Sequence, residues 1–493
     1  MKHFNKPRSV IITKISVSSL FLLFLLSVHS VITAHGVELD YLVVATSSLK
    51  LGGDVAMCSG HKVTPPVNNT WLPLNRPHGP CSSSFSASEG TLLLDDMLSW
   101  DELRTDYIRM KLASGGEENY TLPEAVTVTS TQRAQLLEAD FSLGDTGEDT
   151  SSEALQSDPT NRAPIGNSVV SQTMAVDTGS DVPWVQCFPC PVPPCHQQSD
   201  QLYDPTKSTT STWIPCGSPA CRRLGIYGSG CSSSRCGYTI NYGGGSATAG
   251  NYISDTLTLT PKAVVRNFRF GCSHSVRGSF SDQTAGVMAL GGGTQSLLSQ
   301  TAGIFGNAFS YCIASPSSSG FLSLGRPVGA ASSFARTPLI RSTWAPTFYL
   351  VRLRAIIVAG QVLNVPATVF SAGSVMDSSV IVTQLPPTAY VALRAAFRYA
   401  MRMYPLAPPV GMLDTCYDFI RFTTVKVPKV ALVFDGGAVL ELDASSVMLD
   451  GCLAFAATSS DMSVGFIGNV QQQTYEVLYD VGGGAVGFRR GAC

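Results

Sequence analysis

The sequence reads Ala175-Val176-Asp177-Thr178-Gly179-Ser180 and, about 200 residues later, Val375-Met376-Asp377-Ser378-Ser379-Val380. Each stretch places an aspartate directly after apolar residues, which is typical of a carboxylate at the end of a buried strand. The separation is about the length of one β lobe, so the pattern predicts a duplicated lobe. Two such aspartates, one from each lobe, suggest a single catalytic dyad.

The chain from Val169 onward has the texture of β structure. Short runs rich in Val, Ile, Thr, Tyr and Phe are separated by Gly, Pro and Ser, and they span 252–259, 265–270, 321–324, 348–358 and 427–434. The sequence therefore predicts an all-β fold. Each half also contains a run of Gly and apolar residues, 286–291 and 465–469, that we expect to brace its aspartate.

One helix is predicted within this β region, at residues 388–401. Tyr390, Leu393 and Phe397 are spaced to line one face of it, and Thr388 is placed to cap its start. We interpret that face as core packing.

Size and charge narrow the class of protein. With 493 residues, of which 44% are hydrophobic, the chain can bury two cores. Charged residues make up only 14%, and 33 Lys and Arg against 35 Asp and Glu leave a net charge of −2. This balance gives no attraction for nucleic acid or for an anionic membrane.

The N-terminus is typical of a secreted protein. Basic residues precede an apolar run at 20–28, and the small Ala34 follows, so residues 1–34 are predicted to be a signal peptide. No later segment reaches the roughly 20 apolar residues of a membrane span, and we expect no membrane association after cleavage. Asn68 and Asn119 begin glycosylation sequons.

Residues 35–160 are predicted to be a pro-segment and linker. Its acidic portion, 138–158, lacks strand periodicity. A helix is expected at 93–111, with apolar residues at helical spacing and a basic end at Arg109 and Lys111. Two interpretations of that basic end stay open: it lies over an acidic cleft, or it is a solvated helix face.

Cysteine usage agrees with secretion. All but two of the 14 cysteines, Cys58 and Cys81, lie from Cys187 onward. Cys187, Cys190, Cys195 and His196 also have spacing that zinc could use, but a secreted chain favours disulfides.

The proposed dyad implies a definite chemistry. Two carboxylates held close together share one proton, so that one acts as a base and the other as an acid. Such a pair can activate water and protonate a peptide carbonyl without a metal or other cofactor. We expect no cofactor and no metal site.

The motifs also stand in a recognisable order. The stretch Asp177 to Trp184, then Tyr242-Gly243-Gly244-Gly245-Ser246, then Asp377-Ser378, then Ile467-Gly468-Asn469, resembles pepsin-like aspartic peptidases, and among them the plant nepenthesin-like branch. The resemblance covers 160–493. It implies a bilobal fold with two similar β-barrel-like lobes, 161–340 and 341–493, and a cleft between them, in a monomer that acts on polypeptides.

The resemblance also implies residue roles. Asp177 and Asp377 match the catalytic aspartates, with Thr178, Gly179, Ser180 and Ser378 in support around them. Tyr242, on a hairpin flap with Gly243 and Gly245, matches the tyrosine that closes over substrate, and Trp184 matches its hydrogen-bonding partner. Similarity to nepenthesins further implies six disulfides, namely Cys187–Cys190, Cys195–Cys272, Cys216–Cys236, Cys221–Cys231, Cys312–Cys493 and Cys416–Cys452.

Several residues depart from the family pattern. Ser379 replaces a Gly, and Val380 replaces a Thr or Ser, so the second aspartate is predicted to lose an O–H donor. Gly244 replaces a flap Asp, and Ala289 replaces a brace Gly. Because 160–168 does not resemble the usual leading strand, we expect the first lobe to lack one edge strand.

Two functions therefore stand open. The first is a secreted aspartic endopeptidase that works at acidic pH, extracellular or sorted onward to a vacuole or plastid. The second is a peptidase-like binding or inhibitor protein without turnover, which Ser379 and Val380 favour. A serine or cysteine hydrolase fits poorly, because no G-x-S-x-G context is present and the cysteines are committed to bridges.

Overall fold

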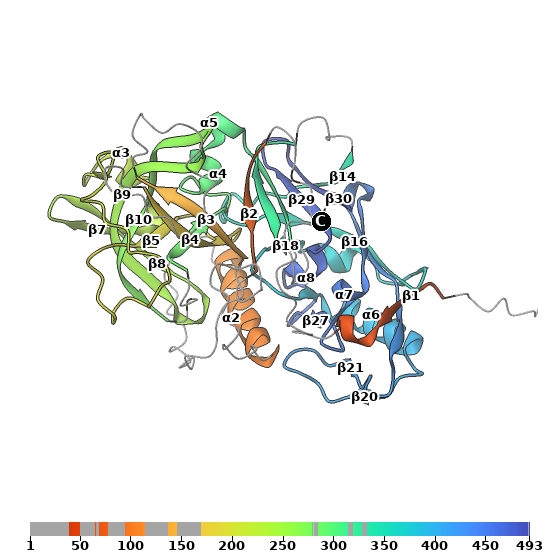
Figure 1. Ribbon diagram of the computed structural model, residues 1–493. Helices are drawn as coiled ribbons and strands as arrows, with labels where there is room; N and C mark the ends of the chain where they lie inside the picture. Colours follow the sequence, from red (N-terminus) through yellow and green to blue (C-terminus); the bar gives the residue numbers. More distant parts are fainter. Residues whose placement is uncertain are drawn as a thin grey trace, which may run out of the picture. The chain divides into compact units, whose positions relative to one another are not determined.

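The computed structural model describes residues 39–49, 65, 69–76, 94–113, 137–144, 169–278, 280, 284–313, 319–327, 333–491 and 493 (Figure 1). The chain divides into two compact units, Met1–Asp40 and Tyr41–Cys493, and the second contains both aspartates. The predicted signal peptide, Asn68, Asn119 and residues 160–168 lie outside the described residues. None of the helices in the described ranges is long and apolar enough to cross a membrane.

The first lobe is a barrel-like sheet with the strand order β10-β5-β11-β4-β3-β9-β8-β7. β10 pairs with both β5 and β9, which closes the path on itself. Trp184, Tyr238 and Tyr252 are fully buried in its core. Its strands are β3 (Leu137–Leu143), β4 (Val170–Asp177), β5 (Trp184–Gln186), β6 (Thr212–Trp213, paired with β9), β7 (Gly228–Ser232), β8 (Arg235–Asn241), β9 (Ala247–Thr260), β10 (Ala263–Arg277) and β11 (Gly286–Ala289).

β3 corrects the predicted start of this lobe. A strand that the sequence was expected to lack before the first aspartate is present at 137–143: β3 pairs with β4 along its whole length and lies between β4 and β9, so it is an inner strand of the sheet and not an edge strand. Leu137, Ala139, Phe141 and Leu143 are all buried, in the alternation of a strand. The acidic residues between them concealed this alternation. Whether processing occurs near residue 160 stays a prediction.

The second lobe consists of three smaller sheets. One contains β15 (Leu350–Val351), β18 (Ser374–Met376), β28 (Gly465–Ile467), β19 (Thr383–Leu385) and β27 (Phe455–Ala457). The second contains β17 (Gln361–Val362), β16 (Leu353–Val358), β23 (Val430–Phe434) and β24 (Val439–Leu442). The third contains β20 (Leu406–Ala407), β21 (Cys416–Tyr417), β26 (Cys452–Leu453) and β25 (Met448–Leu449). The predicted all-β, two-lobed architecture is confirmed.

A six-stranded sheet draws on both halves of the chain and on the stretch before them. Its order is β14 (Ala335–Pro338), β30 (Ala485–Arg490), β29 (Tyr475–Asp480), β12 (Ala308–Cys312), β13 (Gly320–Leu324) and β2 (Thr70–Leu74). A second early strand, β1 (Tyr41–Ala45), pairs with β22 (Thr424–Pro428). Early parts of the chain thus pair with late ones.

Helices are few, as expected. The long ones in the described ranges are α2 (Leu94–Ala113) and α6 (Pro387–Ala400). α6 buries Tyr390, Leu393 and Phe397 as predicted, but it begins at Pro387, and Thr388 bonds Asp461 instead of capping the helix. The short helices are α3 (Pro219–Arg222), α4 (Leu297–Gln300), α5 (Ala302–Phe305), α7 (Ala444–Val447) and α8 (Asn469–Gln472), and the 3-10 turns are η1 (Thr46–Leu49), η2 (Gly225–Tyr227), η3 (Gly243–Gly245), η5 (Ala367–Phe370) and η6 (Asp435–Gly437).

The disulfides agree with the expectation at two of six bridges, Cys312–Cys493 and Cys416–Cys452. The other four expected pairings are wrong; the structure has Cys187–Cys272, Cys190–Cys195, Cys216–Cys231 and Cys221–Cys236. Register explains the first, since β5 runs beside β10 and brings the Cα atoms of Cys187 and Cys272 to 5.3 Å. Cys236 faces the barrel core beside Cys221, whereas Cys231 lies on the exposed β7.

Candidate active site

The two aspartates end equivalent strands in the two lobes. β4 ends at Asp177 and runs parallel to β11, whose Ala289 lies opposite the aspartate. Asp377 follows β18, which runs parallel to β28. The predicted braces are therefore present in both lobes, and Ala289 fits its position while fully buried.

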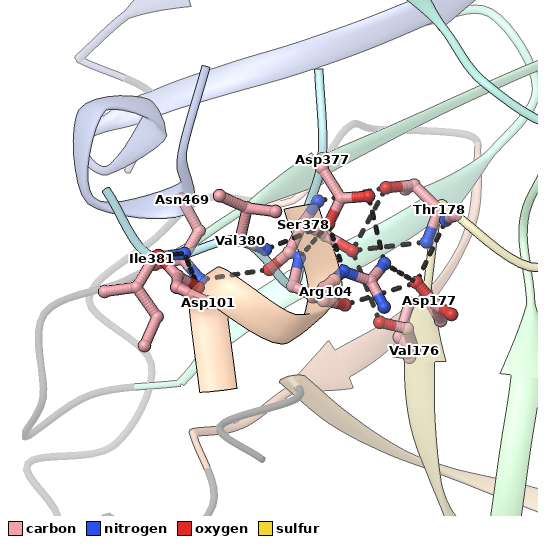
Figure 2. A network of polar contacts seen from close by, with 12 residues as sticks. Asp101, Arg104, Val176, Asp177, Thr178, Asp377, Ser378, Val380, Ile381 and Asn469 are labelled. Carbon is pink, nitrogen blue, oxygen red and sulfur yellow. Dashed lines mark hydrogen bonds and ion pairs between the residues drawn. The ribbon is translucent and has the colours of Figure 1, made fainter. Parts of the chain in front are cut away.

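The residues after the aspartates interlock across the lobes. The backbone N–H of Thr178 donates to Ser378 Oγ at 3.2 Å, and the N–H of Ser378 donates to Thr178 Oγ1 at 3.0 Å. Asn469 Nδ2 donates to the carbonyl of Ser378 at 3.1 Å (Figure 2). These buried hydrogen bonds hold the two loops in one fixed arrangement.

Backbone amides support both carboxylates. Gly179 N–H donates to Asp177 Oδ1 at 2.9 Å, and the N–H groups of Ser379 and Val380 donate to Asp377 Oδ1 at 2.8 and 2.9 Å. Ser379 therefore keeps the amide contact that a glycine makes in the first loop. Ser180 lies beside Asp177, and its hydroxyl helps to lower the pKa of that carboxyl. The hydroxyl oxygen is buried and has no hydrogen-bond partner among the residues that the structure describes.

Arg104 of α2 joins the two aspartates. One guanidinium nitrogen lies 2.6 Å from Asp177 Oδ1 and 2.9 Å from Asp377 Oδ2, and Nε donates to Asp377 Oδ1 at 3.1 Å. Figure 2 shows the guanidinium between the carboxylates. Burial alone would raise the pKa of Asp177, but the charge of Arg104 and the N–H of Gly179 bring it below its usual value. Burial opposes the charge on Arg104, yet the two aspartates raise its pKa above the ordinary value.

A second buried charge anchors the same helix. Both oxygens of Asp101 accept the N–H of Ile381, at 2.7 and 2.9 Å, and one also accepts the N–H of Val382 at 3.0 Å. Burial raises the pKa of Asp101 to about 7, although these N–H donors oppose the rise. On either side of it, Leu94, Met97 and Leu98 pack into one apolar cluster of the second lobe and Ile108 into another.

The opposite side of α2 covers the flap. Tyr107 Oη donates to the carbonyl of Asn241 at 2.7 Å. A Cβ added to Gly243 would lie 2.8 Å from the carbonyl oxygen of Leu103, so the helix backbone rests directly on the glycine turn η3. Next to this turn, Trp184 Nε1 donates to Tyr242 Oη at 2.8 Å. The helix thus occupies the space between the flap and the dyad.

The predicted helix is present, but sequence reasoning left the role of its basic end open and did not consider Arg104. Arg109 contacts Gln384 and lies 5.0 Å from the ring centroid of Phe466, and Lys111 lies over Tyr107, so neither is bonded to the aspartates. Arg104 stands three residues after Asp101 and four before Ile108, on the buried face. The helical spacing indicates that Asp101, Arg104 and Ile108 share one face, but not what that face contacts.

A cavity of about 260 Å³ lies beside the helix. Gly179, Asp181, Tyr227 and Thr347 line it from the lobes, and Tyr107 lines it from α2. In the ranges that the structure describes, no group of three or more His, Cys, Asp or Glu side chains is placed to hold a metal ion.

Known proteins are similar to this chain in sequence and in fold. Residues 161–326 match the family described as "Xylanase inhibitor N-terminal", and residues 348–490 match "Xylanase inhibitor C-terminal". An aspartyl protease family protein of Arabidopsis thaliana is 42% identical over 332 residues, which cover 65% of this chain and 69% of that protein. The chain belongs to the pepsin-like plant aspartyl protease family.

Other members and neighbours widen the comparison. The aspartic proteinase nepenthesin-2 of Nepenthes gracilis is 34% identical over 339 residues, covering 66% of this chain and 75% of that protein. The crystal structure of basic 7S globulin from soybean aligns with a TM-score of 0.54 at 20% identity, covering 72% of this chain and 91% of the globulin. That last likeness concerns the fold alone.

Proposed function

We propose that this member of the aspartyl protease family is a secreted, monomeric endopeptidase that hydrolyses polypeptides at acidic pH and is held latent by α2. The observation that carries the proposal is the bridging of Asp177 and Asp377 by one nitrogen of Arg104, at 2.6 and 2.9 Å. Carboxylates that one nitrogen can bridge are close enough to share a proton and to bind one water between them.

The reaction follows from the groups around the dyad. With α2 withdrawn, a water takes the place of the guanidinium nitrogen. One carboxylate removes a proton from this water as its oxygen attacks the peptide carbonyl, and the other, protonated, donates its proton to the carbonyl oxygen. The interlocked Thr178 and Ser378 keep the two carboxylates at a fixed separation, and the flap with Tyr242 closes over the substrate.

Latency follows from the space that α2 occupies. Arg104 forms ion pairs with both carboxylates, and the helix backbone rests on Gly243 of the flap. No substrate carbonyl therefore reaches the dyad while α2 is bound. The stretch that contains α2 therefore acts as an inhibitory pro-segment. The loss of carboxylate charge at acidic pH weakens its hold.

A second function is a binding or inhibitor protein on the same frame. Val380 favours this function, because its buried side chain brings no hydroxyl to Asp377. The names of the two matching families, which refer to xylanase inhibitors, also favour it. The intact amide donors and the facing aspartates favour the peptidase.

The deciding experiment is cleavage of a denatured protein at about pH 3 to 5, with and without pepstatin. The full chain, allowed to activate in acid, is compared with its Asp177→Ala variant. Cleavage that pepstatin blocks and the variant lacks is the expected result. If neither chain cleaves, and activity appears only after Ser379→Gly and Val380→Thr are introduced together, the protein is a binding protein.

A further inference from the structure

Ser379 makes a contact that its position in the second loop does not suggest. Its backbone N–H donates to Oδ1 of Asp377, the aspartate of its own loop. Its hydroxyl Oγ, in contrast, donates to Oδ1 of Asp177, the aspartate of the other lobe, at 3.2 Å. Ser379 as a whole is 2% exposed. The hydroxyl is therefore a buried donor fixed beside a carboxylate, and it spans the junction between the lobes.

The equivalent position in the first loop has no room for the same group. A Cβ added to Gly179 would lie 2.8 Å from Asp377 Oδ2 and 2.6 Å from the bridging nitrogen of Arg104. A side chain there would have to displace the carboxylate. The dyad thus accepts one extra hydroxyl, and only on the side of Asp177.

Val380 reinforces this asymmetry. Its N–H bonds Asp377, but its side chain packs with Ile108, Phe348 and Phe466 in an apolar cluster. Among the described residues, Asp377 receives backbone N–H groups and Arg104 but no hydroxyl. Asp177 has the Gly179 N–H, the Ser379 hydroxyl and the nearby Ser180.

We propose that Ser379 is a positioning residue that holds the negative charge of the dyad on Asp177. The hydroxyl missing at Val380 acts in the same direction, because it leaves Asp377 with one donor fewer. This role of Ser379 deepens the proposed peptidase function and rests on it. Asp177 is then the base that takes a proton from water, while the water oxygen bonds to the carbonyl carbon. Asp377 gives its proton to the carbonyl oxygen, so the charge passes from Asp177 to Asp377 and the tetrahedral product is neutral.

The hydrogen-bond donors to Asp177 that belong to the lobes are in place while α2 is bound and remain when α2 leaves. While α2 is bound, the charge of Arg104 is the largest of the effects that lower the pKa of Asp177, although burial raises it. After release, the hydroxyl of Ser379 and the N–H of Gly179 are the donors left on Oδ1. A donor to the ionised form favours that form, and its loss should matter most at the acidic end of the activity range.

The test compares Ser379→Ala, Ser379→Gly and Ser379→Thr in the full chain that also carries Arg104→Ala to free the dyad. The buried Ser273→Ala, which is not bonded to either aspartate, is the matched control for folding. We expect the Ala and Gly variants to lose about tenfold in kcat at the acidic limb, the size of one hydrogen bond to a charged group, with KM little changed. The Thr variant, which keeps the hydroxyl, should restore kcat at the acidic end of the pH profile.

A second readout does not depend on turnover. An epoxide is opened by a carboxylate but not by a carboxylic acid, so peptide mapping after labelling reports which aspartate is ionised. We expect label mainly on Asp177, and a shift of about tenfold toward Asp377 in Ser379→Ala and Ser379→Gly. Label that stays on Asp177 in both variants overturns the proposal, whether or not the chain cleaves peptides. A parent chain that labels as expected but never cleaves overturns the peptidase function instead.

Discussion

α2 and β3 both precede the first aspartate, yet the protein holds them in different ways. α2 satisfies its backbone hydrogen bonds internally and bonds to the lobes through side chains, chiefly Arg104 and Asp101. β3 exchanges its backbone hydrogen bonds with β4 and β9. A helix can leave a surface with its backbone still paired, whereas a strand between two others cannot.

Within the stretch before the first aspartate, α2 therefore has the features of a removable inhibitor, whereas β3 is part of the barrel. The docking of α2 also involves two carboxyl groups whose pKa values are shifted, Asp177 of the dyad and Asp101 of the helix, whereas β3 contributes mainly buried apolar side chains. We therefore expect maturation to remove α2 and to retain β3. Changes made separately to the two elements test this contrast.

The largest effect is expected from removing β3. A chain that begins at residue 161 loses the buried Leu137, Phe141 and Leu143 and leaves β4 and β9 unpaired between them. Three such side chains contribute roughly 5 to 8 kcal/mol, comparable to the whole stability of a typical domain. We expect no cooperative thermal unfolding transition.

The matched comparison is a chain that begins at residue 131: like the shorter chain it lacks β1, β2 and α2, but it keeps β3. It should show near-ultraviolet circular dichroism of a folded protein and a single sharp transition. Equal folding of the two truncated chains would mean that β3 is not an integral strand of the barrel.

The next effect is expected from Arg104→Ala in the full chain. With α2 bound, this change leaves two buried carboxylates without their cation, and breaking a buried pair costs roughly 3 to 5 kcal/mol. The bound state of the helix should lose at least about tenfold in population, and cleavage of a peptide substrate at about pH 5 should rise accordingly.

Arg109→Ala is the control for Arg104→Ala, because Arg109 lies on the same helix but contacts Gln384 and Phe466. It should change the rate much less. A rate equally unaffected by both variants would show that α2 does not limit access to the dyad.

Much of the fold was predictable because its signals are local. The two aspartate stretches, the strand runs and the face of α6 depend on residues close in sequence. The leading strand was missed because Glu138 and Asp140 interrupt a buried alternation; Glu138 is 1% exposed even so. Local polarity there gave the wrong answer because β3 is held by its pairing with β4 and β9, which residues 137–143 alone do not specify.

The site was predictable in its members but not in its contacts. Asp177, Asp377, Thr178 and Ser378 come together as the motifs suggested. Arg104 depends on which helix face docks, and the contact of Ser379 with Asp177 depends on how the lobes meet, so neither is encoded at short range. The same limit explains the missed bridge Cys187–Cys272, which depends on the register of β5 with β10. Cys231 and Cys236 lie opposite each other on β7 and β8, yet they bond Cys216 and Cys221, which lie outside these two strands.

The smallest effect concerns the pH range over which α2 stays bound. The pKa of Asp177 is lowered in the bound state, so its contribution to docking is present above the unbound value and is lost as the pH falls through the bound one. Asp101 acts in the opposite sense. Its pKa is raised from 3.8 to about 7 by burial, so it favours docking below the lower value and opposes it as the pH rises past the higher.

Docking should therefore be tightest in mildly acidic solution and weaken on both sides. Hydrogen exchange of the α2 amides between about pH 3 and 9 measures this profile, after correction for the intrinsic exchange rate. Asp101→Asn, which cannot ionise, should remove the weakening on the alkaline side and leave the acidic side unchanged, because the acidic side belongs to Asp177 and Arg104. An unchanged alkaline slope in this variant would show that Asp101 is not the group that titrates, and would leave the titration of Asp177, paired with Arg104, as the main link between α2 and solution pH.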